Sequence, residues 1–524
     1  MEKAADQARL AGQRLHHFHG GLRLRHNKRV SCQVPLQRTP IPPRLAIPLL
    51  QHAGEEGEAV VVPGQAVLKG EVIGRYGSPS EGLVHAPTSG TITAIARQPI
   101  AHPSGMDGKC ILLKPDGLDR WATLHPLTDW ENTEAEVLRQ RIRESGIVGL
   151  GGAVFPTGLK VDKAQNSAVH TLILNGAECE PYISCDEMLM REQPEQVVLG
   201  ARIMQKAVEA EQTIIAIEDQ MGAVFQALQN AIDEAGCKRI QLVKVTTIYP
   251  EGGEKQLIQV LTGLEVPGGG RPGDLGLLCQ NVATAAAVAS AVTEGKPLIE
   301  RIVTVTGKGV KEPRNLVALL GTSLSILVDQ CGGYTPDAAR LVVGGPMMGY
   351  ALASDQNPVV KATNCVLIPV ESDIRPAQAE MPCINCGECA RVCPALLLPQ
   401  SLHWQIRNNL LDEAADYGLD ECIECGCCDF VCPSHIPLVE WFRFGKSGIA
   451  KLTRERESAE LARQRFEARE ERLERIKRER RERMELKKKA LLSDAEKKKK
   501  IADTLNRARN RDAGTDPDPG ASSE

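Results

Sequence analysis

Nine of the chain's 17 cysteines lie between Cys383 and Cys432, and their spacing is suited to holding metal. The stretch "CINCGECARVCP" begins at Cys383, and "CIECGCCDFVCP" repeats its arrangement from Cys422. Both follow C-x2-C-x2-C-x3-C-P, the bacterial ferredoxin run that ligates a 4Fe-4S cluster. Structural zinc instead uses pairs of cysteines separated by roughly a dozen or more residues. The double motif therefore favours two iron–sulfur clusters over zinc sites.

In such a run, three cysteines on one loop reach the same cluster, and the fourth points at the neighbouring cluster. We therefore expect crossed ligation. The expected ligands are Cys383, Cys386, Cys389 and Cys432 for the first cluster, and Cys422, Cys425, Cys428 and Cys393 for the second. Cys427 fits no ligand position, and we interpret it as a packing residue beside the second cluster. The eight cysteines outside this region have no common spacing, which is typical of core thiols.

The composition excludes several other classes of protein. With 524 residues, of which 42% are apolar, the chain is long enough for roughly three or four domains. No apolar run approaches the ~18 residues that a membrane span needs. The N-terminal stretch "MEKAADQARLAG" lacks the pattern of a secretory signal, so we expect a cytosolic setting that keeps thiols reduced and disfavours disulfides.

A glycine-rich segment, "GIVGLGGAVFPTGLKVD", runs from Gly146 and contains Lys160. Glycines allow backbone N–H groups to approach a phosphate, and a following helix N-terminus adds a favourable dipole. The segment matches neither the Rossmann pattern nor a Walker loop. On its own it is as compatible with a turn that binds nothing as with a phosphate site.

Three further segments change that balance: "LNGAECEPYISCDE" from Leu174, "YPEGGEKQLIQVLTG" from Tyr249 and "CQNVATAAAVA" from Cys279. In this order the four segments resemble the FMN- and NADH-binding subunit of respiratory complex I. Together with the double ferredoxin motif, they make the chain similar to the C subunit of the Rnf-type ion-translocating electron-transport complex, also called the SoxR-reducing complex. The resemblance covers roughly residues 15 to 445.

The resemblance implies an FMN pocket with NADH as substrate. Lys160 and the glycines would contact the FMN phosphate, Phe155 would be a stacking surface, and three acids would face flavin or NADH. The implied residues are Gly149, Gly151, Gly152, Phe155, Lys160, Asn175, Glu178, Glu180, Tyr249, Gly252, Glu254, Asn281 and Thr284. No catalytic nucleophile or general base is implied.

The chain departs from the complex I pattern at three positions. Ala177 stands where that pattern has Asp, Gly253 where it has Glu, and Lys163 where it has an aromatic ring. These positions belong to the nicotinamide side of the pocket more than to the flavin side. The FMN assignment therefore has more support in the sequence than direct binding of NADH.

The expected fold class is multidomain α/β and α+β. Short Val/Ile strands broken by Gly and Pro indicate β structure near the N-terminus. The expected domains are a barrel-sandwich (biotinyl/lipoyl-like) domain at 15–130, an α/β FMN- and NADH-binding domain at 135–295, a soluble ligand-binding β-grasp module at 299–370, an α-helical double 4Fe-4S ferredoxin-type domain at 376–445, and a charged helical and disordered tail at 446–524.

The tail carries 22 Lys and Arg against 13 Asp and Glu between 451 and 510. Glu/Arg pairs spaced by four residues favour a solvated single helix. Attraction to anionic lipid or to acidic partners is the alternative interpretation, and nucleic acid is not an expected partner. The last stretch, "GTDPDPGASSE", has the composition of a disordered segment.

The resemblance to the Rnf-type subunit implies a peripheral subunit on the cytoplasmic face of the inner membrane that acts as an NAD(H)-linked oxidoreductase. A nicotinamide gives two electrons at once, whereas an iron–sulfur cluster accepts one. A flavin between them can accept the pair and pass the electrons on singly. The expected partners are the other subunits of a membrane-bound Rnf-type complex, with ferredoxin or a ferredoxin-like subunit as a further candidate. Two alternatives stay open: a flavin-free relay from ferredoxin, and an assembly scaffold whose clusters are structural.

Overall fold

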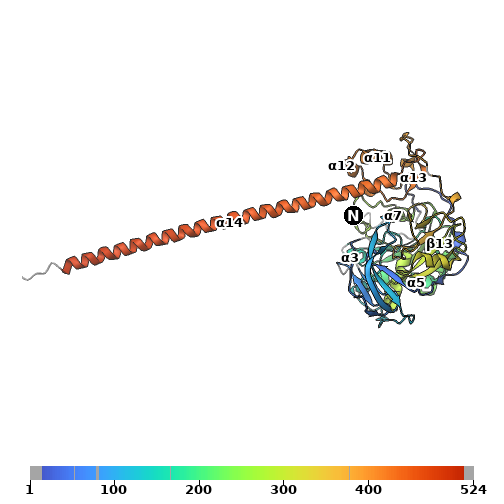
Figure 1. The fold of residues 1–524 in the computed structure, drawn as a ribbon, viewed down its shortest axis with the longest axis horizontal. Helices are drawn as coiled ribbons and strands as arrows, with labels where there is room; N and C mark the ends of the chain where they lie inside the picture. Colours follow the sequence, from blue (N-terminus) through green and yellow to red (C-terminus); the bar gives the residue numbers. More distant parts are fainter. Residues whose placement is uncertain (1–14, 52–53, 78–81, 166, 377, 513–524) are drawn as a thin grey trace, which may run out of the picture. The chain divides into compact units, whose positions relative to one another are not determined.

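The computed structural model of the 524-residue chain describes residues 15–51, 54–77, 82–165, 167–376 and 378–512. The chain divides into two compact units, Met1–Lys446 and Ser447–Glu524. Figure 1 shows the elements in chain order, coloured from blue to red. All strands of the described residues belong to the first unit.

The N-terminal part of the first unit is antiparallel β structure, drawn in blue in Figure 1. One sheet has the order β2-β8-β7-β4 and a smaller one the order β3-β5-β6. Their core includes Leu45, Ile47 and Ile73, which are fully buried. The strands are β2 (Leu45–Pro48), β3 (Glu58–Ala59), β4 (Ala66–Val67), β5 (Val72–Arg75), β6 (Leu83–His85), β7 (Gly90–Pro99) and β8 (Asp107–Pro115).

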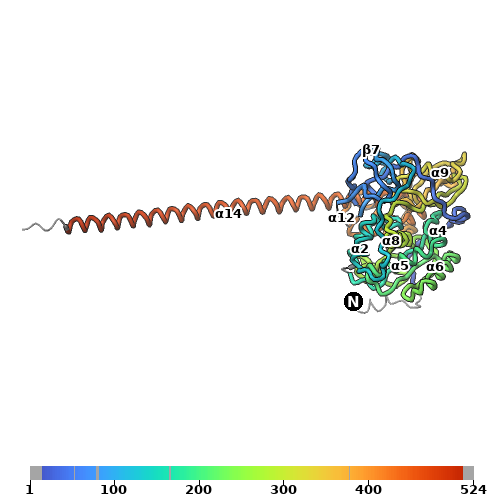
Figure 2. The backbone as a smooth tube through the Cα atoms, turned by 90° about the horizontal axis from the view of Figure 1, so that it is seen from below, coloured from blue at the N-terminus to red at the C-terminus, as the bar shows by residue number. Residues whose placement is uncertain are grey.

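The next part is α/β, with a parallel sheet in the order β11-β10-β9-β12. Its strands are β9 (Thr171–Gly176), β10 (Gln212–Glu218), β11 (Ile240–Val245) and β12 (Leu277–Asn281). The helices are α2 (Ala135–Glu144), α3 (Thr157–Gln165), α4 (Cys185–Glu192), α5 (Pro194–Ala207), α6 (Gly222–Glu234), α7 (Glu254–Thr262) and α8 (Val282–Thr293). Helices α5 and α8 pack against each other (Figure 2).

This parallel sheet is buried on both faces. Leu172 and Leu174 of β9 pack into the core that α5 and α8 share, whereas Ile173 packs toward α7. A strand buried on both faces needs an unbroken apolar run, which "TLIL" supplies. The chain moves outward from β9 to β11 and then returns as β12 on the other side of β9. Such a reversal of strand order opens a crevice at the carboxyl ends of β9 and β12, the strands on either side of the reversal.

A six-stranded sheet follows, in the order β1-β14-β13-β17-β15-β16. Its elements are β1 (Gln37–Arg38), β13 (Glu300–Thr306), β14 (Arg314–Leu319), β15 (Leu341–Val343), β16 (Tyr350–Leu352), β17 (Cys365–Leu367) and α9 (Leu324–Gln330). Strand β1 precedes the N-terminal β domain in sequence, yet it pairs in parallel with β14. The sheet therefore has an edge strand that the sequence did not predict.

The cysteine-rich part is helical, as expected. Its elements are α10 (Glu388–Arg391), α11 (Pro399–Arg407), α12 (Leu411–Asp416), α13 (Cys427–Val431) and the beginning of α14 (Leu438–Asp512). Helices α10 and α13, one from each ferredoxin run, pack against each other. Single-turn 3-10 helices lie at η1 (Lys28–Ser31), η3 (Pro272–Leu275), η4 (Glu371–Asp373) and η5 (Leu419–Glu421).

Helix α14 begins inside the predicted ferredoxin-type domain, where Leu438, Val439 and Phe442 are buried. From Thr453 to Arg511 every side chain is exposed, and Arg463 bonds to both Glu460 and Glu467. This part matches the predicted solvated helix with Glu/Arg pairs. The predicted disordered stretch "GTDPDPGASSE" lies outside the described residues.

Candidate functional site

The eight cysteines expected to be ligands line two separate cavities. One is lined by Cys383, Cys386, Cys389 and Cys432, and the other by Cys393, Cys422, Cys425 and Cys428. Each cavity takes three thiols from one run and the fourth from the other run. The structure thus brings together the two crossed sets that the spacing predicted.

Both runs have the same local structure, which explains how they present three thiols to one point. The residues Asn385 and Gly387 have positive φ, and so do Glu424 and Gly426 at the matching positions of the second run. This left-handed backbone turns the loop tightly before the short helix. In each run a backbone N–H, from Asn385 or Glu424, donates to the thiol of the first cysteine at 3.4 Å.

The two cavities differ in exposure. Cys383 and Cys386 are exposed, whereas Cys393, Cys425 and Cys428 are buried. Burial raises the pKa of the Cys422 thiol in the second cavity to about 11. Four thiolates can share such a buried space only with a cationic metal core, so the donor set fits an iron–sulfur cluster. The first cavity lies at the protein surface.

Cys427 lies in the wall of the second cavity, and it interacts with Cys425 through a side-chain hydrogen bond. It also packs with Cys179 and Tyr249 of the α/β part. A fifth thiol beside four suitably placed ones is not needed for a cubane. This position agrees with the interpretation of Cys427 as a packing residue.

The glycine-rich loop runs along the N-terminus of α8. Thr284 accepts a hydrogen bond from the Leu150 N–H at 2.9 Å, and Asn281 caps the helix by accepting from Ala283 N at 2.8 Å. A Cβ on Gly151 would lie 3.2 Å from the Cβ of Asn281. Gly152 has a φ of +111° with open space beside it. The loop therefore requires glycine and leaves room for a ligand at the helix N-terminus.

Lys160 and Asn175 meet the N-terminus of α7 at the same crevice. The Lys160 ammonium group pairs with Glu254 at 2.5 Å and donates to the Cys279 carbonyl at 2.6 Å. The Asn175 amide donates to the Gly252 carbonyl at 2.7 Å. Asn175 is the next-to-last residue of β9 and pairs with Asn281, the last residue of β12, so the predicted residues converge where the strand order reverses. Within the glycine-rich loop, the Gly149 N–H donates a hydrogen bond to the Phe155 carbonyl.

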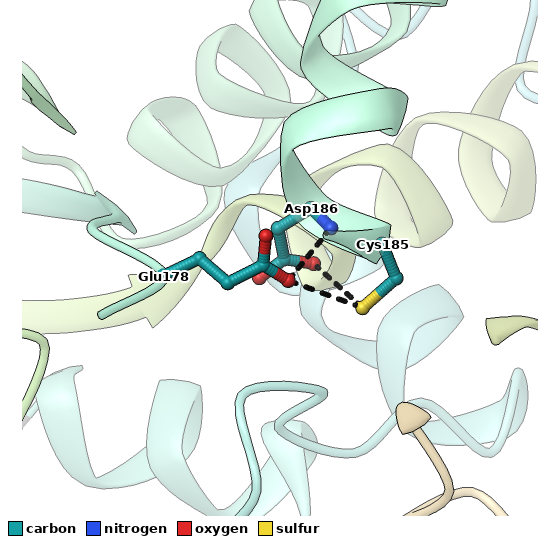
Figure 3. Close-up of side chains that lie close together, drawn as sticks. All are labelled: Glu178, Cys185 and Asp186. Carbon is teal, nitrogen blue, oxygen red and sulfur yellow. Dashed lines mark hydrogen bonds between the residues drawn. The ribbon is translucent and has the colours of Figure 1, made fainter. Parts of the chain in front are cut away.

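Glu178 is turned into the protein rather than toward this crevice. Its carboxylate accepts from the Asp186 N–H at 3.0 Å and lies beside the Cys185 thiol (Figure 3). Lys28, which is 5% exposed, pairs with Glu178 at 3.5 Å and with Glu218 at 3.7 Å. The carboxylate oxygens of Glu178 thus have their partners inside the protein. The sequence had led us to expect Glu178 to face flavin or NADH instead.

The sequence analysis missed Lys28, because no local pattern marks a lysine that pairs with the carboxylates of two residues as distant in the sequence as Glu178 and Glu218. Burial opposes its charge, but Glu178 and Glu218 outweigh burial and raise the pKa of Lys28 above its usual value. Burial raises the pKa of Asp186 to about 7 and that of Glu218 to about 7. Lys28, together with the buried guanidinium group of Arg301, is therefore what makes this buried group of acids tolerable.

Two other predicted residues make contacts that the sequence did not indicate. Glu180 accepts hydrogen bonds from the N–H groups of Met347 and Met348, at 2.8 and 3.2 Å, and burial raises its pKa. Tyr249 is buried, and its hydroxyl donates to the Cys425 carbonyl at 2.6 Å. Tyr249 thus reaches the wall of the second cysteine cavity.

Phe155 is 37% exposed, which fits the predicted stacking surface. The ammonium group of Lys163 lies 5.5 Å from the centre of its ring. Lys163 stands where the complex I pattern has an aromatic residue. A cation therefore lies near the Phe155 ring in place of that second aromatic side chain.

A larger cavity of about 600 Å³ lies elsewhere, between α8, α4 and the edge of the six-stranded sheet. It touches Leu150 and Asp186 from behind the glycine-rich loop. Its lining includes Arg301, whose guanidinium group donates to the Leu150 and Thr363 carbonyls. None of Lys160, Asn175, Glu254 or Asn281 lines it.

Four family models match the chain, in the order of its domains. They are described as the RnfC barrel sandwich hybrid domain (residues 16–118), the Nuo51 FMN-binding domain (142–290), the SLBB domain (302–351) and the 4Fe-4S dicluster domain (382–436). They confirm the predicted fold class.

Curated relatives carry a name that identifies them as the C subunit of an "Ion-translocating oxidoreductase complex". The one from Edwardsiella ictaluri is 47% identical over 88% of this chain and 57% of its own length. The one from Pseudomonas aeruginosa is 44% identical over 87% of this chain and 58% of its own length. The one from Yersinia pestis bv. Antiqua is 44% identical, over 86% of this chain and 72% of its own length.

The chain thus spans a little under three fifths of the first two of these relatives. Among solved structures, an NAD+-reducing NiFe-hydrogenase in its H2-reduced state aligns with a TM-score of 0.45 and 19% identity, covering 58% of this chain and 61% of that one. No helix of the described residues combines the length and the apolar character needed to cross a membrane.

Proposed function

Because the chain belongs to the family of C subunits of ion-translocating oxidoreductase complexes, we propose that it is the NAD(H)-linked electron-transfer subunit of such a complex. When bound, FMN would exchange a hydride with a nicotinamide and single electrons with the iron–sulfur clusters. The observation that carries the proposal is the contact between Tyr249 and Cys425, which joins the crevice of the α/β part to a four-cysteine cavity.

The two 4Fe-4S clusters are assigned to the two cavities. One set is Cys383, Cys386, Cys389 and Cys432, and the other is Cys393, Cys422, Cys425 and Cys428. Thiolates on left-handed loops that also supply N–H groups to sulfur are suited to a cubane, since such donors stabilise its negative charge.

The FMN is assigned to the crevice at the ends of β9 and β12. Gly151, Gly152 and the N-terminus of α8 offer N–H groups to its phosphate, and Lys160 offers the nearby cation. Asn175, Gly252 and Asn281 form the polar wall. Lys160 would then share its charge between Glu254 and the phosphate.

NAD(H) is assigned to the outer side of the same crevice. Phe155 is exposed there as a stacking surface, and Glu254 is the predicted acid that remains at the crevice. Glu178 and Glu180 hold surrounding backbone in place through the hydrogen bonds described above. They act as positioning residues for the loop that follows β9.

The order in which electrons would pass the flavin and the two clusters follows from the burial of the two cysteine cavities and from the contact between Tyr249 and Cys425. The second cavity is buried and touches Tyr249, so its cluster would exchange electrons with the flavin. The first cavity opens to the surface at Cys383 and Cys386, and Ile384 between them is 68% exposed. The cluster there would exchange electrons with another protein of the complex. The membrane partners, the cytoplasmic face and a role for ferredoxin are part of this proposal.

One contact favours a second candidate, the flavin-free relay. Lys160 is already neutralised by Glu254, so the crevice is electrostatically complete without a phosphate. In that case electrons would enter the buried cluster from ferredoxin. The scaffold alternative has no such observation in its favour.

Anaerobic purification with a count of flavin and clusters tests the proposal, and Lys160→Ala separates the two candidates. A charge-assisted contact to phosphate is worth about 1.5–3 kcal/mol, so the variant should lose FMN affinity by roughly ten- to a hundredfold. Reduction of the clusters by NADH should fall with it, whereas both dithionite-reduced EPR signals should persist.

Lys163→Ala, on the same helix, is the matched control and should retain FMN. Full flavin occupancy in Lys160→Ala would show that the crevice is wrongly assigned. Absence of flavin from the wild-type protein, with both clusters present and reducible by ferredoxin, would favour the relay.

A further inference from the structure

Three side chains donate hydrogen bonds to carbonyl groups of the cysteines that line the second cavity. The Tyr249 hydroxyl donates to Cys425 O at 2.6 Å, and the Lys446 ammonium group donates to Cys422 O at 2.6 Å. The Nδ1 atom of His19 lies 3.0 Å from Cys393 O. A carbonyl oxygen can only accept, so this nitrogen carries the hydrogen.

The first cavity differs: there the side chain of Gln400 contacts a cysteine sulfur itself, with 3.4 Å between its Oε1 and Cys389 Sγ. Among the residues that the structure describes, no side chain donates to the carbonyls of Cys383, Cys386, Cys389 or Cys432. The two ferredoxin runs have the same spacing and the same loop conformation, so this difference does not arise from the motif itself. It arises from the elements that surround the second run.

Burial and these donors have opposite effects on a cluster. Reduction adds a negative charge, and a buried site with little solvent disfavours that charge. Hydrogen bonds to the cluster sulfurs are a recognised means of adjusting the reduction potential. The three donors here bind carbonyl oxygens of the cysteine residues instead. Each places a positive hydrogen near the cluster and offsets the negative end of a peptide dipole, which stabilises the reduced form. The donors around the second cavity therefore offset the burial of its cysteines.

Tyr249 is the donor that comes from the α/β part. It is 2% exposed, so water does not compete for its hydrogen bond. Its backbone is fixed by a pair of hydrogen bonds with Leu22. Gly252 and Glu254, which belong to the crevice, follow Tyr249 within five residues of the chain. Tyr249 thus links the crevice to one ligand of the buried cluster.

We propose that Tyr249 is a positioning residue that raises the reduction potential of the cluster held by Cys393, Cys422, Cys425 and Cys428. The proposal rests on the proposed function in so far as it requires a 4Fe-4S cluster in that cavity. It assigns to Tyr249 a role toward the cluster instead of the flavin contact implied by resemblance. His19 and Lys446 contribute in the same direction.

Tyr249→Phe tests this, because it removes only the hydroxyl group. Both clusters of the anaerobically purified full-length protein are titrated, with EPR following each signal. The signals are assigned with Cys428→Ala, which removes a ligand of the buried cluster only. We expect the midpoint potential of the buried cluster to become more negative, and that of the exposed cluster to stay unchanged.

The matched control is Tyr350→Phe. Tyr350 donates to the Ala101 carbonyl at 2.6 Å, the same bond at the same distance, but away from both cysteine cavities. It should leave both potentials unchanged. His19→Leu is the second variant, and it should shift only the buried cluster, in the same direction. It keeps the test informative if Tyr249→Phe loses iron.

An unchanged potential for the buried cluster in Tyr249→Phe, with iron retained, would overturn the proposal. If that variant loses iron, an unchanged potential in His19→Leu would overturn it. An equal shift of both clusters would also overturn it, since it would indicate a general structural effect. Absence of 4Fe-4S clusters from the wild-type protein would instead overturn the proposed function. The two failures are thus distinguishable by iron content and EPR before any variant is made.

Discussion

Cys389 and Cys393 lie four positions apart on the same run, yet they line different cavities. Cys389 lies on the short helix α10, whereas Cys393 follows the end of that helix and lines the cavity of the other run. A single substitution in one run can therefore damage the cluster that is held mainly by the other.

Cys393→Ala should abolish or convert the cluster of Cys422, Cys425 and Cys428, while the EPR signal of the cluster at Cys383, Cys386 and Cys389 survives. The reason is that the cubane loses one of its four thiolates. Cys427→Ala is the control and should leave both signals intact. Loss of the cluster at Cys383 with survival of its neighbour would contradict crossed ligation.

Lys28 shows how one charge can determine the stability of its surroundings. It lies among Glu178, Glu218 and Asp186, and the latter two have pKa values raised by burial to about 7. A carboxyl group with a raised pKa binds its proton more tightly in the folded state. Stability therefore falls as the pH rises from the unfolded pKa, about 4, to the folded value.

Lys28→Met should destabilise the first unit by about 3–5 kcal/mol at pH 8, because it leaves buried carboxylates without their cation. The loss should be smaller at pH 6, where those groups take up protons. The midpoint of urea unfolding at the two pH values measures this difference. Lys296→Met removes an exposed ion pair with Glu294 and should cost at most about 1 kcal/mol. A loss independent of pH would contradict the electrostatic explanation.

At the scale of elements, α14 has two parts with different surroundings. In its first turns Val439 and Phe442 line the second cavity and Leu438 lines the first, and Lys446 donates to the Cys422 carbonyl. Beyond Leu452 the helix exposes all its described side chains up to Arg511 and is supported by ion pairs along its own surface. Such pairs are worth only tenths of a kcal/mol each.

Truncation after residue 451 should therefore leave both clusters and the flavin content unchanged, since no predicted ligand lies beyond it. Weaker membrane association that is sensitive to salt would favour the electrostatic role of the basic segment. Truncation after residue 437 is the contrasting variant and should cost the second cluster. Iron content and EPR of the purified proteins provide the measurement. Loss of iron from the shorter deletion would be unexpected.

At the scale of the whole molecule, the segment of residues 15–31 holds separate parts of the first unit together. Gly21 bonds to the Val392 carbonyl in the ferredoxin-type domain, and Leu22 pairs with Tyr249 in the α/β part. Ser31 bonds to Ser184 and accepts from Asn315 of the six-stranded sheet. Three predicted domains therefore meet along one N-terminal stretch.

The unequal exposure of the two cavities predicts unequal reactivity. Cys383 and Cys386 are exposed, so oxygen and chelators should reach the first cluster sooner than the second. After brief air exposure followed by anaerobic re-reduction with dithionite, the EPR signal assigned to the first cluster should be lost while most of the second returns. Decay of both signals at the same rate would contradict the assignment of an exposed and a buried carrier.

The sequence by itself determined the features whose causes are local. Cysteine spacing gave the two crossed ligand sets, because the geometry of each run depends on a dozen consecutive residues. The sequence indicated an α/β domain at 135–295, and charge pairs indicated the exposed helix. The resemblance of four segments indicated which residues converge at the ends of β9 and β12.

The tertiary structure alone decided the relations between distant residues. Lys28 and Glu178 are 150 residues apart, and Tyr249 and Cys425 are 176 apart, and neither pair leaves a periodic trace in the sequence. The directions of Glu178 and Glu180 depend on N–H groups that other elements present to them. The two runs share one motif, so only the elements packed around each of them make one cavity buried and the other exposed.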